Sequence, residues 1–455
     1  MIRTLAKIWS IPELKQKIVF TLLILAVCRI GAYIPVPGVN GDLAVSLLKQ
    51  AAGGIQNLFQ LMDIFSGGAF AQMTVTALGV MPYISASIIM QILVAVIPSL
   101  QRDIRESPDQ GRRKMSKWTR MATLFLSLIH SFVYARFMLG LNESNPGIVL
   151  SSLTDNLWFG SPILFYMIVM VTMTTGTLFL MWMGEQISEK GIGNGVSLII
   201  TIGILSSLPS TIGTMIQQLN LDSQQAGSLS ITTLLILLAL FVFIIVGTIL
   251  VIQGQRKIAL QHARRVVGRH EVQGGSSHIP LKLNYAGVIP VIFASSFLMF
   301  PAMIAQLLGG SNVSRFATWL SPGSFVYMTL YVLLIMAFTY FWTSTQFRPD
   351  QIASDMKKNG AFIPGVRQGK PTQEFLESTM GKITFAGAVF LAMIAILPSI
   401  IGKFLHIDAR ISQFFGGTSL LILVGVVLDT MKQVESHLLM KRYDGFLTKS
   451  RSRSR

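Results

Sequence analysis

The pattern G-V-x-P-x-I-x-A-S occurs twice in this chain, at 79–87 and at 287–295, each time within an apolar run long enough to cross a membrane. Counting the apolar runs between them places the first copy in the second predicted span and the other copy in the seventh. The two copies therefore cross the bilayer in opposite directions, which is typical of an inverted repeat whose working pathway lies between its halves. A chance match of glycine and proline in apolar sequence is the alternative.

The composition is typical of a polytopic membrane protein. Of the 455 residues, 51% are hydrophobic and only 13% are charged. We therefore predict an all-α polytopic membrane protein with ten transmembrane helices in two inverted five-helix halves, 18–213 and 231–431, joined by an outer hinge loop at 214–230. The predicted spans are 18–37, 75–98, 119–140, 161–184, 195–213, 231–252, 285–308, 324–346, 383–402 and 411–431.

The distribution of basic residues predicts the orientation. All but six of the 37 Lys and Arg residues lie in the N-terminal segment, in the loops after even-numbered spans or in the C-terminal tail. By the positive-inside rule these parts, and with them both termini, are cytoplasmic. Residues 1–17 are predicted to form a cytoplasmic amphipathic N-terminus. Residues 432–455 are predicted to form a basic cytoplasmic tail that is disordered toward its low-complexity end, KSRSRSR.

The segment 58–70, LFQLMDIFSGGAF, is too apolar for an ordinary outer loop and too short to span the bilayer. We predict that it re-enters the protein as a half helix, because unpaired backbone is tolerated at membrane depth only inside protein or a cavity. Gly67 and Gly68 interrupt the segment, so it could hinge on a helix expected to begin near Thr74. A re-entrant packing segment without motion is the alternative.

The interiors of the apolar runs contain no Asp or Glu, and the nearest, Glu185 and Asp429, lie at cytoplasmic ends, which argues against an ion-coupled carrier. Arg29 and Arg136 lie in the outer parts of their spans, where each is expected to snorkel or to meet a backbone carbonyl. No Walker-type loop, zinc signature or nucleophile elbow is present, and G-I-G-N-G at 191–195 is expected to be a tight turn into the fifth span. We therefore predict a passive conduit with no catalytic residue, metal site or cofactor.

The repeated motif supplies aliphatic side chains that a conduit could use. Val80 and Ile84 share one face of a helix, and Val288 and Ile292 repeat the pair in the second copy. A ring of branched aliphatic side chains would exclude hydrated ions by dewetting and still yield to a wider object. The proline of each copy is expected to interrupt the helical hydrogen bonds, with nearby serines bonding the freed carbonyls. Ordinary packing against lipid or neighbouring helices is the alternative for any single isoleucine.

Two predicted cytoplasmic loops, 253–284 and 347–382, are long, basic and rich in turn residues. Connections that only join helices are usually short, so we predict a docking surface for an acidic or anionic partner. The alternative is that the positive-inside topology alone requires these charges. The candidate docking residues are Arg256, Lys257, Arg264, Arg265, Arg269, Lys357, Lys358 and Arg367.

Several stretches, in order and across nearly the whole chain, resemble SecY, the family of channel-forming subunits of the bacterial Sec protein translocon. They include RIGAYIPVPG (29–38), ALGVMPYISASIIMQ (77–91), LFLMWMGEQISEKGIGNGVS (178–197) and KKNGAFIPGVRQGKPT (357–372). The resemblance implies a channel for secretion of unfolded preproteins across the bacterial plasma membrane, and for lateral insertion of transmembrane segments into it. It implies SecA with ATP, or the translating ribosome, as the driving force. A secondary transporter or small-solute channel is the alternative, and a purely structural scaffold is a third class.

The resemblance also implies roles for particular residues. Arg367 matches a prominent loop arginine of the family, whereas His270 stands where many members carry a second arginine. The implied partners are SecE, SecG, the SecA ATPase, the ribosome, signal sequences, nascent polypeptides and membrane lipids. The implied pore ring is Val80, Ile84, Ile200, Ile292 and Ile422, and the implied plug is Phe65, Ser66, Gly67, Gly68 and Ala69. The implied lateral gate contains Pro82, Ser87, Met90, Gln91, Pro290, Ser295 and Ser296.

Overall fold

Helices occupy all ten predicted spans in a computed structural model of the chain. In chain order they are α2 (Pro12–Gly31), α5 (Met81–Val96), α7 (Pro108–Ser144), α9 (Ile163–Lys190), α10 (Gly195–Ser206) with α11 (Leu208–Gln218), α12 (Ile231–Gln253), α13 (Ile289–Leu308), α15 (Phe325–Gln346), α17 (Lys370–Phe404) and α19 (Thr418–Arg453). The structure describes residues 11–50, 62–154, 162–218, 230–262, 265–267, 270–272, 275–308, 319–320, 323–405, 411–412 and 418–453.

Six helices in the described part of the chain are long and apolar enough to cross a membrane: 109–143, 163–190, 195–218, 231–253, 325–358 and 370–404. Two further apolar helices, 81–96 and 289–299, are shorter. The remaining predicted spans correspond to α2 and α19, which are helical over part of the predicted intervals.

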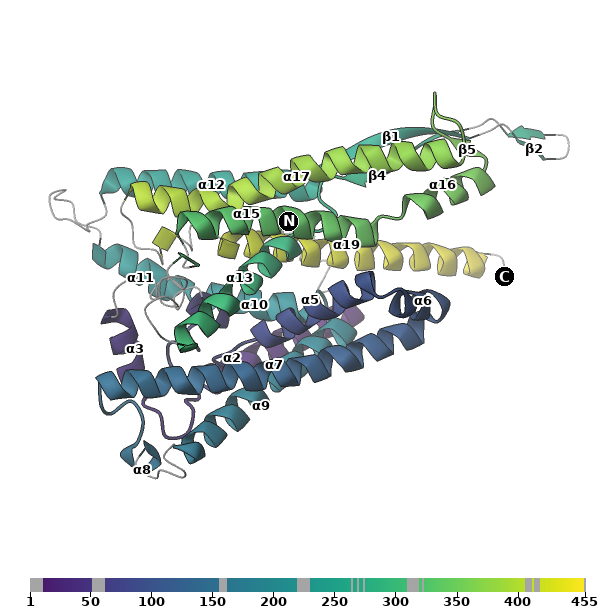
Figure 1. The fold of residues 1–455 in the computed structure, drawn as a ribbon. Coiled ribbons are helices and arrows are strands. Elements are labelled where there is room, and N and C mark those ends of the chain that lie inside the picture. The colour runs from purple at the N-terminus through teal and green to yellow at the C-terminus, as the bar shows by residue number, and fades with distance from the viewer. Residues whose placement is uncertain are drawn as a thin grey trace.

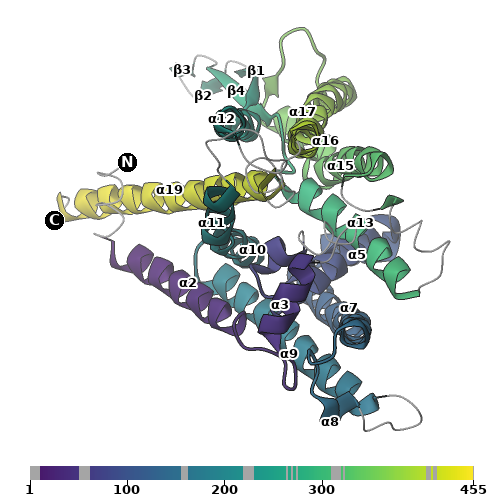
Figure 2. The same ribbon diagram turned by 90° about the vertical axis from the view of Figure 1, so that its left-hand side faces the viewer.

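The helices form two groups that meet along the middle of the molecule. Figure 2 shows α2, α5, α7, α9 and α10 in one group and α12, α13, α15 and α17 in the other. Along the seam α5 packs against α13, and α19 packs against both α10 and α12. Figure 1 shows that α6 (Pro98–Glu106), α16 (Pro349–Lys358) and the C-terminus lie at one end, which we call the basic end. The short helices α3 (Gly41–Gln50) and α8 (Ser151–Thr154) lie at the opposite end.

The two copies of the repeated motif have the same local structure. Gly79 and Gly287 both take the left-handed backbone conformation, with φ of 57° and 61°. Each helix then begins two residues later, α5 at Met81 and α13 at Ile289. The motif proline is thus the second residue of its helix, where its missing N–H costs no intrahelical bond. The expectation that Pro82 and Pro290 interrupt the helical hydrogen bonds is therefore wrong.

Two predicted boundaries also shift. The first span was predicted to reach residue 37, but α2 ends at Gly31 and the chain then forms an isolated β-bridge from Pro35 to Thr74. The second was predicted to begin near Thr74, but residues 75–80 are turns and α5 begins at Met81. Because the backbone of Val36 and Val75 bonds across this bridge, neither segment is free to continue its helix.

The two basic loops fold together at the basic end. Strand β1 (Gln255–His262) pairs antiparallel with β4 (Ser276–Lys282) on one side and with β5 (Ala361–Phe362) on the other. A smaller hairpin pairs β2 (Arg265–Val267) with β3 (His270–Val272). Ile258 and Leu260 of β1, with Leu281 of β4, are buried beneath the sheet against Met356 and Leu376. The membrane part is helical as predicted, but its loops carry a small sheet of their own.

The chain ends also differ from expectation. Residues 12–17 form the first turns of α2, so no separate amphipathic segment ends at residue 17, and residues 1–10 lie outside the described part. At the other end α19 continues to Arg453, so the expected disorder of the tail is wrong over that stretch. Lys and Arg have good helix propensity, and extending a helix already nucleated at residue 418 avoids a new nucleation step.

Replacing Gly195 with Ala should lower the melting temperature of the purified protein, because a Cβ there would overlap the carbonyl oxygen of Gly184 where α10 crosses α9. Overpacking of this kind typically costs about 1–3 kcal/mol. Gly213→Ala is the matched control, since a Cβ at Gly213 meets no atom within 4 Å and alanine favours a helix. Equal melting temperatures for the two variants in detergent would contradict the close crossing.

Candidate functional site

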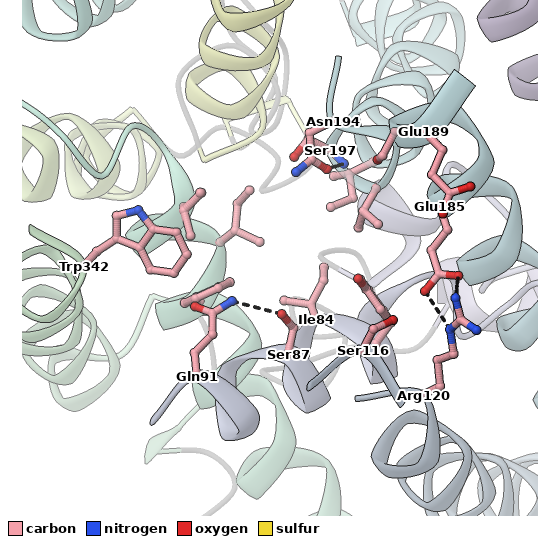
Figure 3. A pocket seen from close by; sticks show the side chains of 17 residues that line it. Ile84, Ser87, Gln91, Ser116, Arg120, Glu185, Glu189, Asn194, Ser197 and Trp342 are labelled. Atoms are coloured by element: carbon pink, nitrogen blue, oxygen red, sulfur yellow. Dashed lines mark hydrogen bonds and ion pairs between the residues drawn. The ribbon is translucent and has the colours of Figure 1, made fainter. Parts of the chain in front are cut away.

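A polar cavity of about 410 Å³ lies between the two groups of helices. We call it the vestibule (Figure 3). Its wall comes from α5, α7, α9 and α10 on one side and from α13 and α15 on the other. Asn194 and Glu189, which line it, lie at the short connection from α9 to α10. The vestibule therefore belongs to the basic end of the molecule.

The vestibule ends on aliphatic side chains that the sequence singled out. Ile84, Ile200 and Ile292 line it, from α5, α10 and α13 respectively. Val80 and Ile422 do not line the cavity but belong to the same hydrophobic core. All five are 0% to 5% exposed, so their side chains are almost completely buried. We call these five side chains, which come from both groups of helices, the constriction.

Two polar pairs in the vestibule escaped the sequence analysis. Arg120 of α7 forms a bidentate pair with Glu185 of α9, at 3.1 Å from Nε to Oε1 and 2.7 Å from Nη2 to Oε2. Gln91 donates from Nε2 to Ser87 Oγ at 3.1 Å, so two predicted gate residues face the vestibule together (Figure 3). The signal that could have revealed Arg120 is its charge at the start of an apolar run, matched by Glu185 at the end of the next.

Among the other predicted gate residues, Ser296 lies at the contact between α5 and α13. Pro82, Pro290 and Ser295 are buried, and Ser296 Oγ approaches Met81 Sδ across the contact at 3.5 Å. Ser295 and Ser296 both donate to the carbonyl of Ile292 at 2.9 Å, so the closer hydrogen bond of Ser296 lies within α13 and only its longer contact with Met81 Sδ crosses to α5. Met90 lies elsewhere, lining an apolar cavity between α5, α6 and α7.

The predicted re-entrant segment lies against α2, α7 and α10. Its described part is a helical turn at 62–66 followed by turns, and residues 58–61 lie outside the described part. Phe65, Gly67 and Ala69 are buried, whereas Ser66 and Gly68 are partly exposed. Tyr134 of α7 donates from its hydroxyl to the carbonyl of Phe70 at 2.6 Å.

Asp63, which the sequence analysis overlooked, accepts at Oδ1 from the backbone N–H of Ala71 at 2.9 Å. Its carboxylate thereby closes the loop of the re-entrant segment on itself.

The vestibule, the constriction and the re-entrant segment follow one another along helix α10. Ser197 lines the vestibule, Ile200 lies in the constriction one turn later, and Gly203 and Ser206 contact the re-entrant segment one to two turns beyond. Because a helix rises 1.5 Å per residue, the three layers follow one another along its axis. The re-entrant segment therefore lies beyond the constriction when viewed from the basic end.

The predicted docking residues that are described lie on both basic loops. Arg256 and Lys257 on β1, Lys357 and Lys358 in the last turn of α16, and Arg367 are all exposed. The loop that carries Arg367 is held by a hydrogen bond from Thr372 Oγ1 to the carbonyl of Arg367 at 2.7 Å. Because β1 pairs with β5, the two basic loops form one surface. The structure does not describe Arg264, Arg269 or the side chains of Arg265 and His270.

Buried aliphatic side chains from both halves, with a cavity before them and a re-entrant segment behind them, are the arrangement of a membrane channel. The SecY family model matches residues 74–431. A protein translocase subunit SecY from Chlamydia muridarum is 61% identical over 99% of this chain and 99% of that protein. This chain belongs to the SecY family. It is accordingly a channel subunit rather than an enzyme.

Solved structures support the fold. One described as a protein-conducting channel has a TM-score of 0.61 and 19% identity, covering 92% of this chain and 91% of that chain. A yeast Ssh1 complex bound to the yeast 80S ribosome gives a TM-score of 0.60 and 15% identity, covering 91% of this chain and 89% of that chain. At these identities the likeness concerns the fold alone.

Proposed function

We propose that this chain forms a protein-conducting translocation channel whose passenger crosses the constriction made by Val80, Ile84, Ile200, Ile292 and Ile422. The observation that carries this proposal is the order of layers along α10, from polar vestibule to aliphatic ring to plug. We call residues 62–70 the plug. An unfolded polypeptide would enter the vestibule from the basic end, push apart the side chains of the constriction and displace the plug.

The aliphatic side chains of the constriction are compatible with a translocating polypeptide of any sequence. Its side chains offer no charge or fixed hydrogen-bond partner, so they would bind no particular residue of the moving chain. When the passenger is absent, the same side chains pack together and exclude hydrated ions by dewetting. The polar vestibule lets the passenger keep its backbone hydrated until it reaches the ring.

The contact between α5 and α13 would act as the lateral gate, through which signal sequences and transmembrane segments leave toward lipid. It is supported by the short hydrogen bonds that the hydroxyls of Ser295 and Ser296 donate within α13, to the carbonyl of Ile292. Ser296 Oγ with Met81 Sδ is the one polar contact described between the two helices, and thioether sulfur is a weak acceptor. The two helices can thus separate without leaving strong hydrogen bonds unpaired.

The basic end would dock the partner that drives transport, either the SecA ATPase or the translating ribosome. The exposed cations on the two paired loops favour an acidic or nucleic-acid surface. Ribosome binding by the yeast complex of similar fold is consistent with this orientation. The basic end then faces the cytoplasm of a bacterial plasma membrane, with both termini on that side. SecE and SecG are the proposed membrane partners.

Locking the proposed gate should abolish transport reversibly. Met81→Cys with Ser296→Cys, placed in a Cys28→Ala background that removes the chain's single native cysteine, would allow a disulfide across the gate. We expect liposomes with this chain, a SecE-type partner, SecA and ATP to protect a signal-bearing preprotein from protease. Oxidation should remove that protection and reduction should restore it.

The Cys28→Ala background alone is the control, and its protection should not respond to oxidation. Protection that persists in the oxidised double variant, once the disulfide is verified by gel shift, would refute this gate. No protection in any preparation would refute protein conduction itself.

A further inference from the structure

Arg29 lies in the last turn of α2 and donates from Nη2 to the carbonyl of Gly67 in the plug, at 3.0 Å. The sequence left open whether this arginine snorkels or meets a backbone carbonyl, and the structure shows that it meets the carbonyl of Gly67. Arg29 forms no salt bridge with any residue that the structure describes. Its guanidinium also lies 5.6 Å from the ring centroid of Tyr33, within the range of a cation–π contact.

Ser206 of α10 also approaches the Gly67 carbonyl, with Oγ at 3.3 Å, and shares its one hydroxyl hydrogen between this carbonyl and the closer carbonyl of Gly203 at 2.8 Å. Gly67 is in the left-handed conformation, with φ of 68°. A Cβ at this position would lie 2.7 Å from Ser206 Oγ and would overlap the Arg29 guanidinium. The fit therefore requires glycine, both for its backbone and for the close approach of its two donors.

Gly203 allows the backbone of α10 to lie close to the plug. A Cβ on Gly203 would lie 2.9 Å from the carbonyl oxygen of Phe65, so the plug rests directly on the helix. A charge-assisted hydrogen bond is stronger than one between neutral groups, and this one exists only while the plug is seated. Contacts that occur in one state alone shift the equilibrium toward that state.

We propose that Arg29, assisted by Ser206, is the positioning residue that latches the plug in the closed channel. This inference rests on the proposed role of residues 62–70 as a plug. Loss of the latch should raise the fraction of resting channels that open. Removal of a hydrogen bond to a charged donor should raise the resting ion current on the order of tenfold.

The test is the resting ion current of the full chain, reconstituted in planar bilayers with its SecE-type partner. We expect Arg29→Ala to raise this current strongly, Arg29→Lys less, and Ser206→Ala less again, because each retains part of the bonding. Arg136→Ala is the matched control, since it removes an outer-span arginine whose exposed side chain makes no described bond to the plug. Its current should equal that of the parent.

Deletion of residues 62–70 separates the latch from the plug on which it rests. If the deletion raises the current and Arg29→Ala does not, the latch is refuted and the plug stands. If the deletion leaves the current unchanged, the plug itself is refuted. Arg29→Ala in the deletion background should add nothing further, whereas an additional rise would show that Arg29 acts on the pore directly. Should Arg29→Ala fail to accumulate, Arg29→Met replaces it, because methionine keeps a long side chain but cannot donate a hydrogen bond, and an unchanged current in Arg29→Met would also refute the latch.

Discussion

Replacing both Ile84 and Ile292 with glycine should make the resting channel conduct ions. These two side chains come from opposite halves and line the floor of the vestibule, where each is 5% exposed. Removing them deletes the aliphatic bulk that keeps this level free of water, so hydrated ions can enter. We expect the resting conductance in planar bilayers to rise by roughly tenfold or more.

Two controls locate the effect in the ring. Ile89→Gly removes the same side chain from the same helix, but at a position that is 50% exposed, and it should give no leak. Changing Ile84 and Ile292 to valine retains branched bulk and should leave the channel nearly sealed. A tight double-glycine channel would show that these residues only pack the core and would reopen the interpretation as a carrier for small solutes.

Replacing Arg367 with Glu should reduce translocation on the order of tenfold, because like charges placed together at an interface cost several kcal/mol. Arg367 is exposed in a loop held by Thr372, so the reversed charge should alter the docking surface without disturbing the fold. The measurement is the rate of preprotein uptake into membrane vesicles driven by SecA, alongside the amount of chain in the membrane. That amount should not change.

Lys370→Glu is the matched control for position. It makes the same charge reversal on an exposed residue three positions later, at the start of α17. If both variants lose the same activity, the surface acts through its net charge and Arg367 has no special role. Normal uptake by Arg367→Glu would remove this residue from the docking surface.

The helical architecture could be predicted because long apolar runs have few alternatives in a bilayer. The residues at which the helices begin could not be predicted, because a proline in an apolar run is equally compatible with a kink inside a helix and with the first turn of one. Pro82 and Pro290 proved to be first-turn residues because Gly79 and Gly287 turn the chain just before them. The strands were missed, although Ile258 and Leu260 in β1 show the alternation that a half-buried strand requires.

The site residues could be predicted only where the same residue pattern occurs twice in the chain. The repeated motif gave Ile84 and Ile292, which the structure places together in the floor of the vestibule. Long-range polar partners are invisible in sequence, so the pairing of Arg29 with Gly67, 38 residues away, needed the fold. The same holds for Arg120 and Glu185, which are 65 residues apart. The roles of the ring, plug, gate and docking residues remain predictions until the variants above are measured.

The small sheet at the basic end is attached to only one half of the protein. Strand β1 begins two residues after α12 ends, and the chain from β5 enters α17 within eight residues. Both helices belong to the second half, and α12 and α17 pack against each other. A partner that pushes on this sheet would thus move the second half relative to the first. The mechanical work of the motor would then be delivered across the seam that contains α5 and α13, rather than spread over the whole bundle.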